Sequence, residues 1–173
     1  VVGEVRRLKG KKILIGECGH ATRSAWYVPA FGGPDAPEVV NCLEYAHQQL
    51  KAGKIPLKDE KIQERVTYHD PCFLGRWNAE YDAPRSVLKL IPGVTLKEME
   101  RERESSLCCG GGGGNFSMDL LGGSSDSPSR RRVHEALATG ADILAVACPK
   151  CLTILEDAVK FEDLDDKLIV KDI

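Results

Sequence analysis

The sequence predicts an α/β fold in which a mainly parallel sheet is flanked by helices. Short apolar segments alternate along the chain with longer segments of helical periodicity, and this order is typical of repeated βαβ units. The segment 143–147 is apolar without a break, as expected of a strand covered on both faces. Apolar residues make up 42% of the 173 residues, which is enough to form a packed core.

The first part of the chain is expected to contain one strand and one helix. A short apolar strand is predicted at 12–15. A helix is predicted over 36–52. Asp35 can cap this helix, Pro37 suits its first turn and Gly53 can end it.

The rest of the chain continues the alternation of strands and helices. Strands are expected at 65–68, 94–99, 143–147 and 168–170, and helices at 82–91, 128–140 and 149–161. The charged segment 101–106 is expected to be exposed, and the segment 110–129, rich in Gly and Ser, is expected to form a loop.

Several reactive or charged residues on the predicted helices are expected to have structural roles. Cys42 is interpreted as a buried core residue, and His47 and His134 as ordinary helix residues. The run 130–132, three consecutive arginines, is interpreted as a solvated face, with a docking patch for an acidic partner or cofactor as the alternative.

The composition argues against several classes of protein. A net charge of −2 and a pI near 6.1 disfavour a nucleic-acid-binding protein, which would usually have a basic face. The sequence contains neither a run of 18 apolar residues nor a signal peptide, so we expect a cytoplasmic protein. Because the chain begins without Met, we interpret it as a fragment or the later half of a longer protein.

Five of the seven cysteines follow one pattern. Cys72 follows the predicted strand 65–68, the pair 108–109 opens a glycine-rich segment, and the Cys-Pro-Lys-Cys segment 148–151 follows the strand 143–147. Since the carboxyl ends of parallel strands meet at one edge of a sheet, we expect Cys72 and Cys148 on the same rim. Thiolates clustered at turns hold soft metals and iron–sulfur clusters, and a reducing compartment suits them.

Two of these motifs are specific enough to interpret individually. Cys148 and Cys151 lie one helical turn apart and can reach one metal centre, although the spacing also fits a thioredoxin-type redox pair or half of a zinc site. The segment 108–114 joins two thiols to five glycines, whose backbone N–H groups can point at cluster sulfurs. A flexible linker is the alternative, and neither a Walker loop nor a Rossmann fingerprint is present.

His69 lies in the segment that joins the strand 65–68 to Cys72. It can donate a proton or hydrogen-bond a cluster sulfur, or it can cap the strand or bond Asp70. The sequence leaves these alternatives open.

The cysteine pattern resembles that of the CCG cysteine-rich domain, which occurs in the B and D subunits of heterodisulfide reductase and in related iron–sulfur oxidoreductases. The motifs that carry the resemblance are Cys72, Cys108-Cys109-Gly110 and Cys148-Pro149-x-Cys151. Segments that read like the D-type branch are 17–21, 68–76, 81–85, 91–93 and 140–144. The resemblance covers residues 12 to 173.

The resemblance implies a particular cofactor site. In this family the domain binds a non-cubane 4Fe-4S cluster through five cysteines. Carried over by position, the implied metal ligands are Cys72, Cys108, Cys109, Cys148 and Cys151. From the residues themselves, we expect Gly110, Gly111 and Gly112 to bind the cofactor. We expect His69 to act as the catalytic proton donor, with His20 as the alternative. Zinc could fill the site in an isolated fragment.

The implied function is that of an iron–sulfur electron-transfer domain in a multi-subunit, heterodisulfide-reductase-like oxidoreductase. It would pass electrons to or from a disulfide, a flavoprotein or a quinone. The expected partners are subunits or domains that carry cubane 4Fe-4S clusters, together with electron-transfer flavoprotein or a membrane quinone-reactive subunit; no nucleic acid is expected. A missing segment or a partner subunit could hold the protein at the inner face of the membrane.

The chain is expected to contain one complete CCG domain and part of another. The segment 12–21 aligns with 142–151, and Ala21 stands where Cys151 stands. We therefore interpret residues 1–60 as the tail of a degenerate first repeat with a connecting helix, and residues 61–173 as the complete domain.

Two other functions remain as alternatives. In a zinc-bound structural or scaffold module of a redox complex, four of the five thiolates would hold the metal tetrahedrally. In a metal-free thiol–disulfide oxidoreductase, Cys148 and Cys151 would react directly.

Overall fold

The computed structural model describes residues 2–16, 19–25, 27–28, 32–58, 61–112, 114–118, 121 and 123–173. The first elements along the chain are α1 (Val2–Arg7), β1 (Lys12–Ile15), α2 (Gly19–Ala25), the 3-10 helix η1 (Gly33–Asp35), β2 (Glu38–Asn41) and α4 (Cys42–Lys51). They are followed by β3 (Glu64–Tyr68), α5 (Asp82–Leu90), β4 (Val94–Leu96), the 3-10 helix η2 (Arg103–Ser105) and α6 (Asn115–Met118). The last are α7 (Pro128–Ala138), β5 (Ile143–Val146), α8 (Pro149–Phe161) and β6 (Ile169–Asp172).

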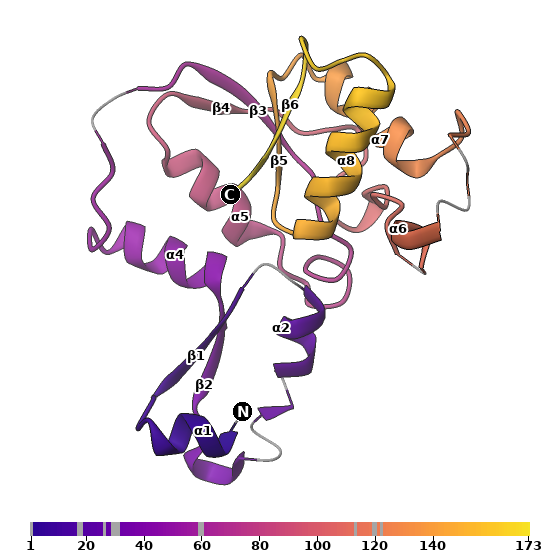
Figure 1. Cartoon of the computed structure of the whole chain (residues 1–173). Helices are drawn as coiled ribbons and strands as arrows, with labels where there is room; N and C mark the ends of the chain where they lie inside the picture. The colour runs from indigo at the N-terminus through magenta and orange to yellow at the C-terminus, as the bar shows by residue number, and fades with distance from the viewer. Residues whose placement is uncertain are drawn as a thin grey trace.

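The main sheet has four parallel strands in the order β4-β3-β5-β6 (Figure 1). The chain leaves β3 for β4 on one side, then returns past β3 to β5 and continues to β6 on the other side. The neighbouring strands β3 and β5 therefore lead into connections that run in opposite directions. In open α/β sheets such a switch point is where ligands bind, outside the carboxyl ends of the strands. The predicted α/β class is confirmed.

The core lies on both faces of the central strand β5. Leu144 and Val146 pack into a cluster with side chains of α7 and α8, whereas Ile143 and Ala145 pack into a second cluster with side chains of β3 and α5. Successive side chains of a strand point to opposite faces, so an unbroken apolar run satisfies both clusters. The expectation that this strand is covered on both faces is confirmed.

A second, smaller sheet lies at the N-terminal end of the molecule, below the main sheet in Figure 1. It consists of the parallel pair β1 and β2, in which Ile13 is opposite Val39 and Leu14 is opposite Val40. From this sheet α4 leads to the main domain, where it packs against α5. β1 is followed by α2 as β5 is followed by α8, but the division of the chain near residue 60 remains a prediction.

The predicted helix over 36–52 is wrong in its first part. Residues 38–41 form β2, and the helix α4 begins only at Cys42. Asn41 caps it in a capping box: its Oδ1 accepts a hydrogen bond from the backbone N–H of Leu43 at 2.9 Å, and the carboxylate of Glu44 accepts one from the backbone N–H of Asn41 at 3.1 Å. Pairing with β1 overrides the local helix signals at 35 and 37.

Other predicted elements agree with the structure, with small differences at their ends. α8 spans the predicted range, while the predicted strand 94–99 ends at Leu96 and the last strand begins at Ile169. The predicted loop 110–129 contains the short helix α6. Cys42 is the first residue of α4 and half-buried, so its predicted place in the middle of a helix is wrong.

Two predictions of solvent exposure are also wrong. Ser106, in the segment expected to be exposed, is buried, and Arg132, expected on a solvated face, has no exposed surface. Both lie on the side of the sheet covered by α7, and they hydrogen-bond each other there.

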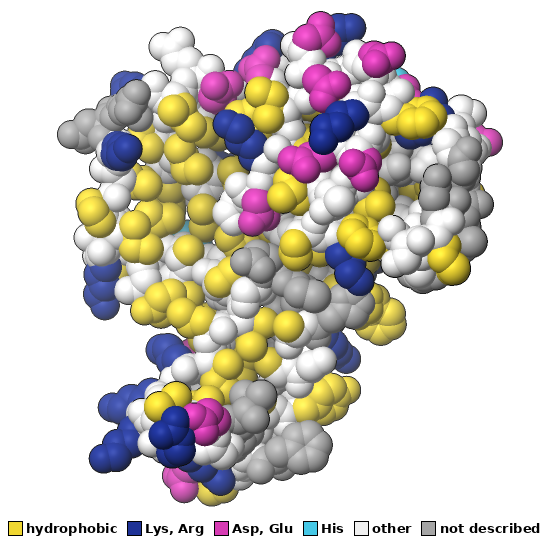
Figure 2. Space-filling model, in the orientation of Figure 1, with side chains coloured by type: hydrophobic (Ala, Val, Ile, Leu, Met, Phe, Trp, Pro, Cys, Tyr) yellow, Lys and Arg dark blue, Asp and Glu magenta, His cyan; other side chains and the backbone are white. Residues whose placement is uncertain are grey.

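The face shown in Figure 2 differs in polarity between its two regions. Acidic and basic side chains alternate over the region of α8, whereas hydrophobic side chains gather on the region of α5 and the loop before β3. Exposed apolar side chains in that second region include Ile55, Leu57, Ile62 and Leu90. Within the described part of the chain, every helix is too short or too polar to cross a bilayer.

Candidate metal centre

Five cysteines from three segments line one pocket at the carboxyl ends of β3 and β5. The pocket has a volume of about 220 Å³ and contains the side chains of Cys72, Cys108, Cys109, Cys148 and Cys151. All five are free thiols. Cys109 and Cys151 are buried, and the other three are half-buried. The topology thus brings together the thiols that the sequence grouped.

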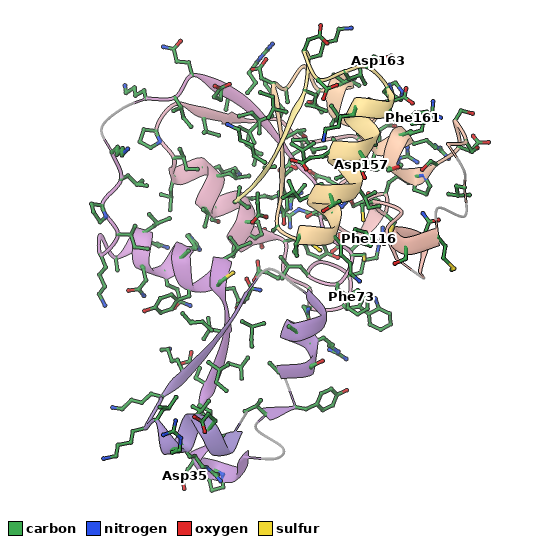
Figure 3. The ribbon with its side chains drawn as sticks, in the orientation of Figure 1. Asp35, Phe73, Phe116, Asp157, Phe161 and Asp163 are labelled. Carbon is green, nitrogen blue, oxygen red and sulfur yellow. The ribbon has the colours of Figure 1, made fainter. Side chains whose placement is uncertain are left out.

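The mouth of this pocket is largely apolar. We define the mouth by lining side chains that are exposed or half-buried, which include Phe73, Phe116 and Lys150. Pro71 also lines the pocket but is buried. Figure 3 shows Phe116 beside the amino end of α8 and Phe73 below it. Phe73 is stacked on the exposed Trp77, with 5.8 Å between the ring centroids.

The five sulfurs form a continuous chain of neighbours. The Cys151 thiol donates to Cys109 Sγ across 3.4 Å. The thiols of Cys72 and Cys108, of Cys108 and Cys109, and of Cys148 and Cys151 are also near enough to shift each other's pKa. The spatial order is therefore 72, 108, 109, 151, 148, and each sulfur reaches the next.

The environment favours ionisation at two of the five sulfurs. The pKa of Cys108 is lowered because the thiols of Cys109 and Cys72 and the Gly110 amide donate to it. The pKa of Cys148 is lowered to about 6, mainly by the Cys151 thiol and then by the backbone amides of Cys151 and Lys150. Thiolates are the form in which cysteine binds metals.

The other three sulfurs hold protons that a cation could displace. The pKa values of Cys72 and Cys109 are raised chiefly because both donate hydrogen bonds to Cys108, and that of Cys109 rises to about 11. The pKa of Cys151 is raised by hydrogen bonds to Cys109 and Cys148. Metal binding to such a site would release these protons.

The glycines that follow Cys109 bring backbone donors to the sulfurs. Gly110 has a φ of +86°, and its N–H donates to Cys108 Sγ at 3.4 Å. The Gly111 amide donates to the sulfur of Cys109, and a Cβ at Gly111 would come within 3.0 Å of Ile154. Gly112 lines the pocket with open space around its Cα. The role of Gly110, Gly111 and Gly112 in binding a cofactor stays a prediction.

His69 is completely buried behind the sulfurs. One of its ring nitrogens lies within 4.8 Å of the Sγ atoms of Cys109 and Cys151, although the ring does not line the pocket. Burial, followed by the charge of Arg132, lowers its pKa to about 3, so the imidazole is neutral near pH 7. The role of His69 as a catalytic proton donor remains a prediction.

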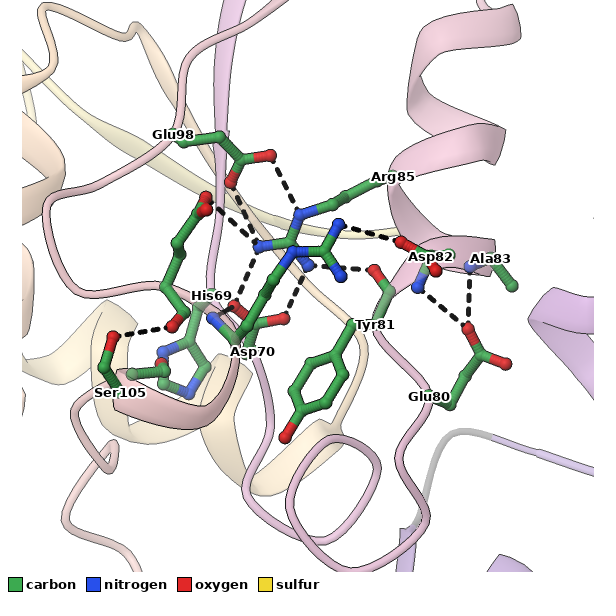
Figure 4. A network of polar contacts seen from close by, with 12 residues as sticks. His69, Asp70, Glu80, Tyr81, Asp82, Ala83, Arg85, Glu98 and Ser105 are labelled. Carbon is green, nitrogen blue, oxygen red and sulfur yellow. Dashed lines mark hydrogen bonds and ion pairs between the residues drawn. The ribbon is translucent and has the colours of Figure 1, made fainter.

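The segment that carries His69 and Cys72 is fixed by a buried ion pair (Figure 4). The guanidinium of Arg85 contacts both carboxylate oxygens of Asp70, at 2.7 and 2.9 Å, and both oxygens of Glu98, at 2.8 and 3.0 Å. The backbone N–H of Arg103 donates to Asp70 at 2.8 Å. Asp70 thus joins the end of β3 to α5 and to η2.

Sequence reasoning missed this ion pair and the buried Arg132. Asp70 and Arg85 both lie in segments that carried the family resemblance, at 68–76 and 81–85, so a signal was present. Arg132 offered no such signal, because its neighbours 130 and 131 are also arginines. Cys18, and with it the cysteine of the proposed first repeat, lies outside the described residues.

With five thiols at the switch point of a parallel α/β sheet, this domain is a cysteine-rich domain of the kind that can hold a metal centre. The comparison with known families identifies the particular one: residues 66–156 match the CCG cysteine-rich domain. The chain belongs to the CCG cysteine-rich domain family, as the resemblance predicted.

Curated relatives in bacteria and archaea support this membership. The chain is 40% identical over 136 residues to the probable iron-sulfur-binding oxidoreductase FadF of Bacillus subtilis, covering 79% of this chain and 19% of that protein. It is 39% identical to the D subunit of the dihydromethanophenazine:CoB–CoM heterodisulfide reductase of Methanosarcina mazei, covering 98% of this chain and 41% of that protein. It is 33% identical to the EtfAB:quinone oxidoreductase of Syntrophomonas wolfei, covering 95% of this chain and 23% of that protein. The chain thus spans less than half the length of these relatives.

We predict that Arg85→Met destabilises the protein by about 3–5 kcal/mol, because it leaves the buried Asp70 carboxylate without its cation. The matched control is Arg65→Met, which removes an ion pair with Asp142 in which both side chains are exposed and should cost less than about 1 kcal/mol. Urea unfolding of both variants measures the difference. Equal losses would show that the buried pair is not the main tie between β3 and α5.

We predict that Gly110→Ala costs about 1–3 kcal/mol, because its positive φ disfavours any side chain. Gly112→Ala is the control, since a Cβ there meets open space, and its stability should change by less than about 0.5 kcal/mol. Thermal unfolding of the metal-free proteins compares the two. A larger loss for Gly112→Ala would contradict the assignment of the strained position to Gly110.

Proposed function

We propose that this chain is an iron–sulfur electron-transfer domain of a heterodisulfide-reductase-like oxidoreductase. The observation that carries the proposal is the convergence of five cysteines on one pocket. Four thiolates would complete a tetrahedral zinc site, and a fifth adjacent sulfur has no place in one. A centre with several irons uses all five.

The residues present fit such a centre. Cysteine thiolates are the usual ligands of iron–sulfur clusters, and hydrogen bonds to the sulfurs set the reduction potential. Here the amides of Gly110 and Gly111 already donate to Cys108 and Cys109. The apolar rings of Phe73 and Phe116 at the mouth limit the access of water.

We assign the ligand role to Cys72, Cys108, Cys109, Cys148 and Cys151, with a non-cubane 4Fe-4S cluster as the cofactor. When bound, this group would supply a site that takes up and releases one electron at a time. The chain itself would hold the cluster by its thiolates, stabilise the charge on the sulfurs through Gly110 and Gly111, and leave one side open at Gly112. Lys150 at the mouth would attract an anionic partner or substrate.

The names of the relatives support the choice of partners. One relative is named as an iron-sulfur-binding oxidoreductase, one as part of a heterodisulfide reductase and one as an EtfAB:quinone oxidoreductase. We therefore propose that cubane 4Fe-4S clusters of another domain or subunit exchange electrons with this site. The remaining partner is a disulfide, a flavoprotein or a quinone. The proposed location is the cytoplasm, with attachment to the membrane through another segment or subunit.

The test is the metal content of the full chain after anaerobic reconstitution with iron and sulfide. We expect about four irons and matching acid-labile sulfide per chain, together with an EPR signal from the oxidised protein. Zinc is assayed on the same sample. Stoichiometric zinc without iron after this treatment would overturn the proposal in favour of a structural zinc module.

We predict that Cys109→Ser loses most of the cluster iron while the protein remains folded, because Cys109 lies in the middle of the chain of sulfurs. Cys42→Ser is the matched control, since Cys42 is the first residue of α4 and does not line the pocket. Iron content and far-UV circular dichroism are measured for both. Unchanged iron in Cys109→Ser would remove this residue from the ligand set.

A further inference from the structure

Arg132 of α7 is a cation with no exposed surface. A charge in such a position is costly unless its donors are paired. Its Nη1 donates to the backbone oxygen of Arg101 at 2.7 Å and to Glu135 at 2.8 Å, and its Nη2 donates to Ser106 Oγ at 3.1 Å. These three acceptors fix the plane of the guanidinium.

The third nitrogen of the guanidinium, Nε, points at His69. It lies 3.1 Å from His69 Nδ1. Arginine has no acceptor and keeps its protons, so Nδ1 must be the nitrogen with the lone pair. A neutral imidazole then carries its proton on Nε2.

This tautomer leaves a buried N–H donor on a ring that lies beside the metal centre. Nε2 of His69 is inaccessible and has no hydrogen-bond partner among the residues that the structure describes. One ring nitrogen lies within 4.8 Å of the sulfurs of Cys109 and Cys151, and Nδ1 is already engaged by Arg132. An unpaired buried N–H is costly, so a sulfur is the partner that the site offers it.

We propose that Arg132 is a positioning residue that holds His69 as the Nε2–H tautomer. His69 then donates a hydrogen bond to a sulfur on the Cys109–Cys151 side of the centre and is excluded as a metal ligand. The exclusion follows because a coordinating nitrogen needs the lone pair that Nε2 lacks in this tautomer. The expected effect on the reduction potential rests on the proposed function. The assignment of the His69 tautomer does not rest on it.

The hydrogen bond has a definite consequence for reduction. An N–H donor stabilises the more negative, reduced form of an iron–sulfur centre and so raises its reduction potential. The comparison of His69→Leu with His69→Gln isolates this hydrogen bond, because both substitutions leave the positive charge of Arg132 in place.

The first experiment determines the tautomer without any cluster. Long-range ¹⁵N–¹H correlation spectra of the reduced, metal-free full chain, assigned with His69→Gln, should show a protonated Nε2 and an unprotonated Nδ1. Ser106→Ala removes one acceptor of Arg132 but not its contact with His69, and should give the same pattern. A protonated Nδ1 in the unsubstituted protein would overturn the proposal.

The second experiment measures the potential and iron content of the reconstituted protein. His69→Leu should keep its iron but shift the one-electron reduction equilibrium about tenfold toward the oxidised form, which is about 59 mV. His69→Gln retains an N–H donor and should shift it less than about threefold. Arg132→Met also removes a buried positive charge, so it should shift the equilibrium in the same direction and at least as far as His69→Leu. Loss of iron in both His69 variants, or equal potentials in all, would overturn the proposal.

The two experiments separate this proposal from the proposed function. If the unsubstituted chain takes up no iron, the electron-transfer function fails while the spectra still decide the tautomer. If Arg132→Met does not fold, the comparison of His69→Leu with His69→Gln still decides whether the donor matters.

Discussion

The buried ion pair between Asp70 and Arg85 is the interaction on which the geometry of the site depends. Asp70 lies between His69 and Cys72, and its carboxylate is also bound by the backbone N–H of Arg103, a few residues before the cysteine pair at 108–109. One carboxylate therefore ties the segments of three cysteines to the same place on the sheet. Because both charges are buried, removing either one would leave the other unpaired in a low-dielectric core, which costs several kcal/mol of stability.

Parallel topology explains why much of the arrangement could be predicted from the sequence. The apolar run at 143–147 and the Cys-Pro-Lys-Cys segment after it define β5 and the start of α8, and the rule for switch points then brings Cys72 to the same rim. The order of the sulfurs was not predictable, because it depends on the turn at Gly110. The start of α4 was misplaced because pairing of 38–41 with a distant strand is not encoded locally.

Arg132 shows a different limit of sequence reasoning. In a run of three arginines it is indistinguishable from its neighbours, and only the acceptors from three other segments make its burial tolerable. Together with the amides of Gly110 and Gly111, it places positive or hydrogen-bonding groups behind the sulfurs. Such an arrangement stabilises negative charge at the centre without adding a charged side chain to its ligands.

The pocket joins two buried sulfurs to three that are partly exposed. Cys109 and Cys151 face the core, while the half-buried Cys72, Cys108 and Cys148 meet the mouth beside Phe73 and Phe116. If a donor and an acceptor both needed close contact with the centre, both would approach the side where the described residues leave sulfurs partly exposed, and they would compete for it. The two partners would then bind in turn, and the dissociation of one partner would limit the rate of electron transfer.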